Sequence, residues 1–193
     1  MRKSAAEKLK EAMEPGRVYR RHELAPHCSS VTRDVNTLVR RGEIVRAAPG
    51  LYYRPKMTSV GPAPAKSEEL VRAFLSDGAF LLLSFNEYNL LGLGLTQLHN
   101  QQFVYNRKRY GDFVLDGKRF SFRRPRDFPE KLSKEFLFVD LLNNREELSG
   151  DTRELEKLVA LKARETDQVA LRKAATKYGK VATRRFFEEA LAA

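Results

Sequence analysis

Apolar side chains recur every three or four positions in two stretches near the start of the chain, residues 5–13 and 31–39. This spacing places them on one face of an α-helix. Ser4, followed three positions later by Glu7, predicts a capping box before the first stretch. Ser30 is a favourable N-cap before the second. The pattern therefore predicts two amphipathic helices, each with one face in a core.

The segments around these helices predict short strands and turns. Residues 18–19 are long enough only for a very short strand, and residues 22–25 fit a short helix that Pro26 ends. Two β-rich runs, 44–46 and 51–53, flank a Pro-Gly turn. The order of helix, strand, helix, turn, helix and hairpin is typical of a winged helix-turn-helix, which we predict for residues 1–56.

A change of composition divides the chain after this region. Residues 57–66 contain prolines, a glycine and other small residues, which predicts a linker. Beyond it, strand-like runs precede a series of helical patterns that starts at Ser133. Strands followed by helices predict an α+β domain over residues 67–193, and the chain as a whole is expected to be α+β. The predicted strands are residues 79–83, 103–106, 113–115 and 119–122.

The net charge of the chain indicates which class of partner it binds. The 193 residues include 36 Lys+Arg and 25 Asp+Glu, a net charge of +11, and most of the excess lies in residues 1–56. Such a balance favours a polyanionic partner such as nucleic acid. No apolar run approaches the length of a membrane span, and the N-terminus has no apolar segment typical of a secretory signal. With one cysteine, no intrachain disulfide can form, so we expect a cytoplasmic protein without a membrane partner.

The polar face of the helix predicted from residue 31 carries arginine, asparagine and hydroxyl side chains. Arginine and asparagine can make paired hydrogen bonds to base edges, so Arg33, Asn36 and Ser30 are predicted to contact bases. Asp34 lies at the flank and is expected to pair with a neighbouring arginine. Basic residues around the helix are predicted to contact DNA phosphates. These are Arg17, Arg20, Arg21, Arg40, Arg41 and Arg46.

A second basic set lies among the predicted strands. It is expected to extend the DNA surface or to bind another polyanion such as RNA, unless it is simply a solvated sheet face. Its members are Arg107, Lys108, Arg109, Lys118, Arg119, Arg123, Arg124 and Arg126.

Three groups suggest other functions. His22, His27 and Cys28 would need further ligands to hold zinc, and the only other histidine is His99, so we expect no metal or other cofactor.

Asp112, Asp116 and Lys118 resemble part of a metal-dependent nuclease site, but Asp116-Gly117 also fits a hairpin turn. A targeted nuclease is therefore the first alternative to a non-enzymatic DNA-binding protein. The second is an interaction adaptor that uses the helices after Ser133. Its aromatic residues would form an exposed strip or, as is more usual at helical spacing, a core. They are Phe136, Phe138, Phe186 and Phe187.

Several segments together resemble the AbiEi-type antitoxins of bacterial type IV toxin–antitoxin systems. They are VTRDVNTLVRRGEIVRAAPGLYYRP (31–55), GPAP (61–64), NEYNLLGLGLTQ (86–97) and the strand-rich FVYN…FSFRR (103–124). The sequence LHNQQ (98–102) departs from the proline that follows this point in many relatives.

The resemblance implies two activities. The N-terminal domain would bind inverted repeats in its own promoter and repress transcription. The C-terminal domain would counteract a nucleotidyltransferase toxin, directly or indirectly, through the positive surface that residues 107–126 match. The recognition helix of the family corresponds here to Ser29, Ser30, Thr32, Arg33, Asn36, Thr37 and Arg40.

Overall fold

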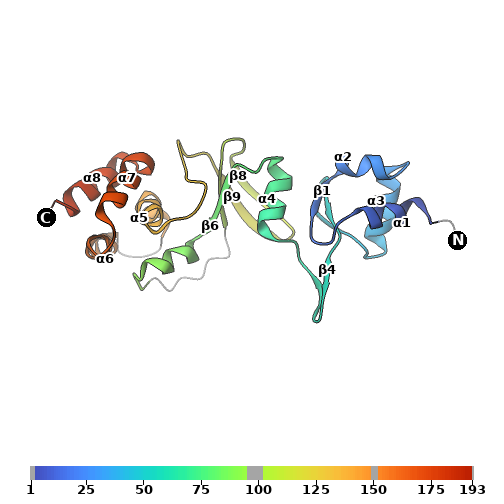
Figure 1. Cartoon of the computed structure of the whole chain (residues 1–193), viewed down its shortest axis with the longest axis horizontal. Helices are drawn as coiled ribbons and strands as arrows, with labels where there is room; N and C mark the ends of the chain where they lie inside the picture. The colour runs from blue at the N-terminus through green and yellow to red at the C-terminus, as the bar shows by residue number, and fades with distance from the viewer. Residues whose placement is uncertain (1–2, 95–101, 149–151, 193) are drawn as a thin grey trace. The chain divides into compact units, whose positions relative to one another are not determined.

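The computed structural model describes residues 3–94, 102–148 and 152–192 and has an α+β fold (Figure 1). The chain divides into two compact units. Unit 1 comprises Met1–Phe80 and Gly111–Phe120, and unit 2 comprises Leu81–Tyr110 and Ser121–Ala193. Among the described residues, no helix combines the length and the apolar character that crossing a bilayer requires.

Unit 1 begins with the helices that the apolar spacing predicts. Helix α1 (Ala5–Ala12) has the expected capping box, in which Ser4 Oγ accepts a hydrogen bond from the Glu7 backbone N–H and the Ser4 N–H donates to Glu7 Oε2. Strand β1, helix α2, a 3-10 turn and helix α3 follow. Their bounds are β1 Val18–Arg20, α2 Arg21–Leu24, η1 Ala25–His27 and α3 Val31–Arg40.

Strands β2 (Val45–Ala48) and β3 (Leu51–Tyr53) form the expected hairpin. Gly50, in its turn, has φ +78°, a conformation that glycine adopts readily. Strand β3 also pairs with β1, so the antiparallel sheet has the order β1-β3-β2. Side chains from α1, α3 and this sheet form one core. Its buried members are Ala6, Leu9, Met13, Tyr19, Leu24, Val35, Leu38, Ile44 and Tyr52.

The predicted linker contains regular structure. Strands β4 (Lys56–Thr58) and β5 (Gly61–Ala63) pair as an antiparallel hairpin. Thr58 Oγ1 donates a hydrogen bond of 2.8 Å to the Gly61 carbonyl. The side chains of Met57 and Val60 are exposed, so backbone pairing rather than burial organises this segment.

The rest of unit 1 is helix α4 (Ser67–Leu75) with strand β8 (Gly111–Leu115) and the start of β9 (Lys118–Arg123). The β8–β9 turn has positive φ at Asp116 (51°) and Gly117 (74°), as a tight hairpin requires. The ring of Phe74 of α4 packs tilted against the ring of Phe113 of β8, with the two centroids 4.9 Å apart. Unit 1 therefore contains α4 and this hairpin together with the N-terminal residues, and the domain boundary at residues 57–66 stays a prediction.

Unit 2 is built around helix α5 (Lys134–Asn143), in which every residue from Phe136 to Leu142 is buried. A 3-10 helix, η2, follows Ser84, and a 3-10 turn, η3, follows α5. Strand β7, most of β6 and the end of β9 belong to this unit. The remaining bounds are β6 Phe80–Ser84, η2 Phe85–Leu91, β7 Gln102–Asn106, η3 Arg145–Glu147, α6 Thr152–Arg164, α7 Gln168–Tyr178 and α8 Val181–Ala190.

The aromatic residues considered for an exposed strip lie in the core of unit 2. Phe136, Phe138 and Phe187 are buried, and Phe186 packs against the same cluster while half-buried. The prediction that aromatic residues at this spacing form a core is therefore confirmed. They do not form the exposed strip that an interaction adaptor would use.

Candidate nucleic-acid interface

Helix α3 has two chemically different faces. Val35 and Leu38 are buried in the core of unit 1, and Val31 and Val39 pack against that core while half-buried. The opposite face is open to solvent. Its exposed side chains are Thr32, Arg33, Asn36 and Arg40.

The one acidic residue of α3 is turned away from this open face. Asp34 is 5% exposed, and its Oδ1 lies 3.6 Å from Arg33 Nε, which confirms the predicted pairing with a neighbouring arginine. Its Oδ2 is buried without a hydrogen-bond partner among the described residues. Because the carboxylate is buried, the exposed face of α3 presents cationic and neutral hydrogen-bonding groups only.

Hydrogen bonds hold several side chains of this face in place. The Arg21 guanidinium, in the first turn of α2, donates to Thr32 Oγ1 and so links the two helices. Arg40 Nε donates to the Asn36 carbonyl at 3.3 Å. The half-buried Thr37 hydroxyl donates to the Arg33 carbonyl at 2.8 Å, so its hydrogen is used within the helix.

Residues before the helix and after it complete the predicted set. Ser29 is exposed and Ser30 is half-buried, and Ser30 is the N-cap of α3 without a side-chain capping bond. Arg41 Nη1 lies 3.9 Å from Glu43 Oε1 at the end of the helix. Arg46 is exposed on β2. The structure therefore brings the N-terminus of α3, its open face and the β2–β3 hairpin into one unit.

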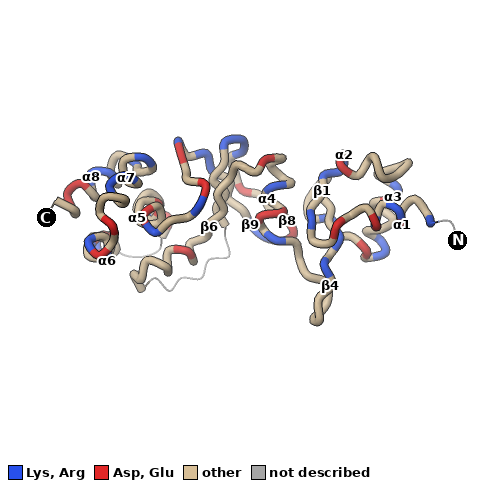
Figure 2. The backbone as a smooth tube through the Cα atoms, viewed as in Figure 1, with Lys and Arg blue, Asp and Glu red and all other residues tan. Residues whose placement is uncertain are grey.

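The cations of this region keep most of their charge available to a ligand. Arg17 lies over the Tyr19 ring, with Nη1 4.0 Å from Glu14 Oε2. Exposed pairs of this kind contribute little and are readily exchanged for a stronger anion. The positions of basic and acidic residues along the backbone are coloured in Figure 2. The exposed arginines of the set are Arg17, Arg21, Arg33, Arg40, Arg41 and Arg46.

Arg20 has a different environment from the other predicted phosphate contacts. Its Nε donates to the Ala73 carbonyl at 2.6 Å, and its Nη2 donates to the Phe74 carbonyl at 2.7 Å. These carbonyls belong to the last turn of α4, where intrahelical donors are lacking. The guanidinium therefore closes the C-terminus of α4, and we do not assign Arg20 to the DNA surface.

The second basic set does not behave as one group. Arg123 forms a bidentate pair with Glu147, donates to Asn144 Oδ1 at 3.2 Å, and lies 4.2 Å from the Phe103 ring centroid. Lys118 Nζ donates to the Ala65 carbonyl at 2.9 Å. Both side chains are therefore occupied by the protein itself. Arg107 pairs with Asp127 at 3.2 Å. The other five are exposed, namely Lys108, Arg109, Arg119, Arg124 and Arg126.

Three further residues of unit 2 lie beside members of this basic set, and the sequence patterns did not identify them. Thr176, Lys177 and Arg184 line a cavity together with Arg107 and Arg126. They lie on α7 and α8, where their spacing is that of ordinary solvated helix positions. No local pattern connects them to a loop fifty residues earlier in the chain, since only the tertiary fold brings them together.

The histidine and cysteine group shows no metal site. His22 and His27 are exposed, and Cys28 is half-buried with its thiol donating to the Leu24 carbonyl. Burial, and then the negative charge of Asp34, raises the pKa of the Cys28 thiol and disfavours the thiolate that a metal requires. Residues 3–94, 102–148 and 152–192 contain no cluster of three His, Cys, Asp or Glu residues placed to hold a metal ion. His99 lies outside the described residues.

The residues of the nuclease alternative have separate partners. Asp116 accepts a hydrogen bond from the Tyr53 hydroxyl at 3.0 Å, and its backbone N–H donates to the Ala47 carbonyl. Lys118 reaches Ala65, as described above, and Asp112 is exposed on β8. Asp116 thus stabilises the hairpin turn, as the turn interpretation of Asp116-Gly117 expects.

Comparisons with protein-family models, curated proteins and solved structures found no match.

Proposed function

We propose that residues 1–56 form a winged helix-turn-helix that binds double-stranded DNA, and that the protein is a sequence-specific transcriptional repressor. In this proposal α3 enters the major groove and the β2–β3 hairpin is the wing. The order α1, β1, α2, α3, β2, β3 and the sheet order β1-β3-β2 support it. The observation that carries it is the exposed face of α3, which has arginine and asparagine side chains and no exposed acid.

The side chains divide into two roles by their position. Arg33 and Asn36 project from the middle of the open face, where paired hydrogen bonds to guanine and adenine edges are possible. The hydroxyls of Ser29, Ser30 and Thr32 lie at its N-terminal end, the end that contacts bases in helix-turn-helix proteins. The surrounding arginines would bind phosphates and set the orientation. They are Arg17, Arg21, Arg40, Arg41 and Arg46.

A selection from random duplexes followed by binding measurements tests the proposal. We expect the selection to return a motif with inverted half-sites, because a repressor of this class binds as a dimer. Arg33→Ala should weaken binding to that motif by about 1–3 kcal/mol and relax the sequence preference. Arg41→Ala should weaken binding to all duplexes alike.

The decisive variant reverses two charges on the open face. Arg33→Glu/Arg40→Glu should abolish specific binding, whereas Lys131→Glu/Lys157→Glu makes the same charge change at exposed positions of unit 2 and should preserve it. Circular dichroism would verify that both variants fold. Wild-type affinity in the first variant, or a selection without a motif, would overturn the assignment of α3.

We also infer from the AbiEi resemblance that the protein is the antitoxin of a nucleotidyltransferase toxin. A toxin reading frame beside the gene is the first observation to seek. Co-expression should then restore growth of cells that the toxin arrests. The Arg33→Glu/Arg40→Glu variant should still protect the cells, because repression and protection would use different surfaces. Failure of the wild-type protein to protect would refute this part of the proposal without affecting DNA binding.

A further inference from the structure

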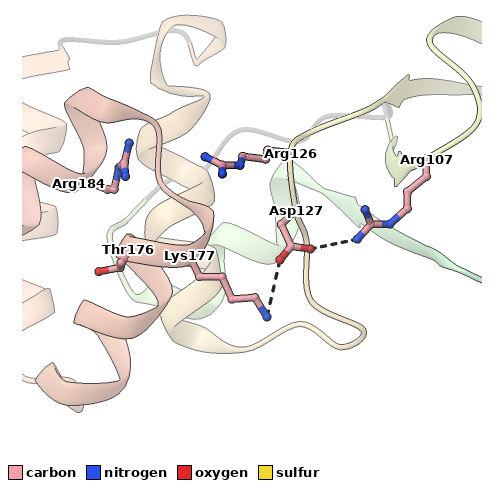
Figure 3. A pocket seen from close by; sticks show the side chains of 6 residues that line it. All are labelled: Arg107, Arg126, Asp127, Thr176, Lys177 and Arg184. Atoms are coloured by element: carbon pink, nitrogen blue, oxygen red, sulfur yellow. Dashed lines mark hydrogen bonds and ion pairs between the residues drawn. The ribbon is translucent and has the colours of Figure 1, made fainter.

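Unit 2 contains a cavity of about 560 Å³ that is lined almost entirely by polar and charged side chains (Figure 3). Its walls come from four places in the chain, namely the end of β7, the loop before α5, the end of α7, and α8. The lining residues are Arg107, Arg126, Asp127, Thr176, Lys177 and Arg184. Four cations and one carboxylate therefore share this space.

Asp127 holds two of the cations in position. Its Oδ1 accepts hydrogen bonds from Arg107 Nη2 at 3.2 Å and from the Phe128 backbone N–H at 2.9 Å. Its Oδ2 lies 3.7 Å from Lys177 Nζ. Figure 3 shows Arg107 and Lys177 reaching this carboxylate from opposite sides. The Arg107 guanidinium also lies 5.6 Å from the Phe128 ring centroid, which fixes its orientation further.

Arg126 and Arg184 have no such counter-ion. In the part of the chain that the structure describes, neither side chain forms an ion pair or a hydrogen bond. Figure 3 shows Arg126 extending from its loop toward Arg184. Two guanidinium groups that line one cavity repel each other, and an anion placed between them removes that repulsion.

The chemistry of the cavity specifies the anion. Guanidinium groups match phosphate oxygens with two parallel hydrogen bonds, and lysine adds a point charge. The polar lining disfavours an apolar small molecule, for which pockets are mostly hydrophobic. The volume exceeds the needs of a single phosphate, and the cations surround it on several sides. We propose that this cavity is a binding site for a chain of linked phosphate groups, as in a nucleoside triphosphate or the backbone of a single-stranded nucleic acid.

Calorimetric titration of the full chain at low salt tests the site, with inorganic tripolyphosphate as the first probe. Wild type should bind it, and Arg126→Ala/Arg184→Ala should bind at least roughly tenfold more weakly, because charged hydrogen bonds are lost. Lys131→Ala/Lys157→Ala removes two exposed lysines elsewhere in unit 2 and is the matched control. It should bind like wild type. Melting temperatures would show that all the variants are folded.

Two further probes identify the source of the phosphates. Adenosine triphosphate that binds more tightly than tripolyphosphate indicates a nucleotide site, and tighter binding of a single-stranded RNA of about ten nucleotides indicates a strand. In either case the cavity variant must weaken binding, and Arg33→Ala/Asn36→Ala on α3 must leave it unchanged. No binding of any probe, or equal binding by wild type and the cavity variant, would overturn the proposal. Neither result would bear on DNA recognition by α3.

Discussion

The Tyr53 hydroxyl, on strand β3, donates a 3.0 Å hydrogen bond to Asp116 in the β8–β9 turn, sixty-three positions later in the chain. The Asp116 backbone N–H donates in turn to the Ala47 carbonyl of β2 at 2.7 Å. Two separate hydrogen bonds therefore fix this turn against the sheet that carries the proposed wing. This explains why residues 111–120 belong to unit 1 rather than to the unit that surrounds them in sequence.

Removing this hydroxyl should make unit 1 less stable. Tyr53→Phe leaves the ring in place and is expected to lower the free energy of unfolding by about 1 kcal/mol at neutral pH, the usual contribution of one hydrogen bond. Urea denaturation would measure the change. Tyr110→Phe removes a hydroxyl from a side chain that is 74% exposed and should change stability by no more than about 0.5 kcal/mol. Equal effects of the two variants would contradict the role given to the Tyr53–Asp116 bond.

The same bond makes stability depend on pH in the alkaline range. Burial, and then the Asp116 carboxylate, raises the pKa of Tyr53 to about 12 from its ordinary value near 10. A raised pKa in the folded state gives a stabilising contribution that is complete below pH 10 and is lost as the pH rises through about 12. The stability difference between wild type and Tyr53→Phe should therefore shrink over this interval. A constant difference from pH 9 to pH 12 would show that Tyr53 does not titrate in this way.

Arg20 should matter for folding more than for DNA binding. Arg20→Ala removes two charged hydrogen bonds from the C-terminal carbonyls of α4 and should cost about 1–3 kcal/mol of stability. Arg17→Ala, three positions earlier, removes an exposed arginine that contacts the Tyr19 ring and Glu14, and it should affect thermal unfolding less than Arg20→Ala does. At a temperature where all variants are folded, Arg20→Ala should retain more DNA affinity than Arg21→Ala. The reverse order would return Arg20 to the phosphate contacts.

Local signals explain which parts of the fold could be predicted. The Ser4–Glu7 capping box and the two faces of α3 depend on residues three or four positions apart, and the structure has both. The turn at Asp116-Gly117 likewise depends on adjacent residues, both of which adopt positive φ. Such features are determined by backbone geometry within a few residues, so a single sequence is sufficient to find them.

Long-range contacts explain what could not be predicted. An arginine such as Arg20 is usually a surface residue. Its two carbonyl partners belong to α4, more than fifty positions later in the chain, so no local pattern reveals them. The cavity between Arg126 and Arg184 likewise requires a loop and two helices to meet. Residues 57–66 have the composition of a linker because backbone pairing in the β4–β5 hairpin needs few apolar side chains. Pattern analysis identifies faces and turns, but not the partner that later covers a charged side chain.

A buried carboxylate in unit 2 provides a further prediction. Asp140 is 2% exposed and accepts hydrogen bonds of 2.7 Å from both Tyr88 and Tyr105. Asn144 donates to the Tyr105 hydroxyl at 3.0 Å, which completes a closed polar cluster inside the core. Asp140→Ala would leave two buried phenols without an acceptor and should cost about 2–4 kcal/mol, measured by urea denaturation. Asp140→Asn keeps a carbonyl oxygen and should cost less, so equal losses would argue against this cluster.

The stability of the wild-type protein and that of the Asp140→Asn variant should also depend differently on pH. Burial raises the pKa of Asp140 above its ordinary value of 3.8, although hydrogen bonds from Tyr88 and Tyr105 oppose the shift. A raised pKa means that the stabilising contribution is complete below the unfolded-state value and is lost as the pH increases through the folded-state value. Wild type should therefore lose stability relative to Asp140→Asn as the pH rises from about 3 toward neutrality. An increase in relative stability over this range would reverse the assigned direction.

Gly179 connects the folding of unit 2 to the proposed phosphate site. A Cβ at this position would lie 2.4 Å from the Ala175 carbonyl oxygen and 2.9 Å from Arg184 Cγ, both far inside normal contact. Gly179→Ala must therefore displace the turn between α7 and α8, and we expect a loss of about 1–3 kcal/mol in stability. Because Arg184 moves with the turn, tripolyphosphate binding should weaken as well. Gly78→Ala is the matched control, since its Cβ meets only the mobile end of Arg72 at 3.1 Å. Gly78→Ala should change neither stability nor tripolyphosphate binding appreciably. A Gly179→Ala variant that behaves like this control would show that the turn accommodates a Cβ.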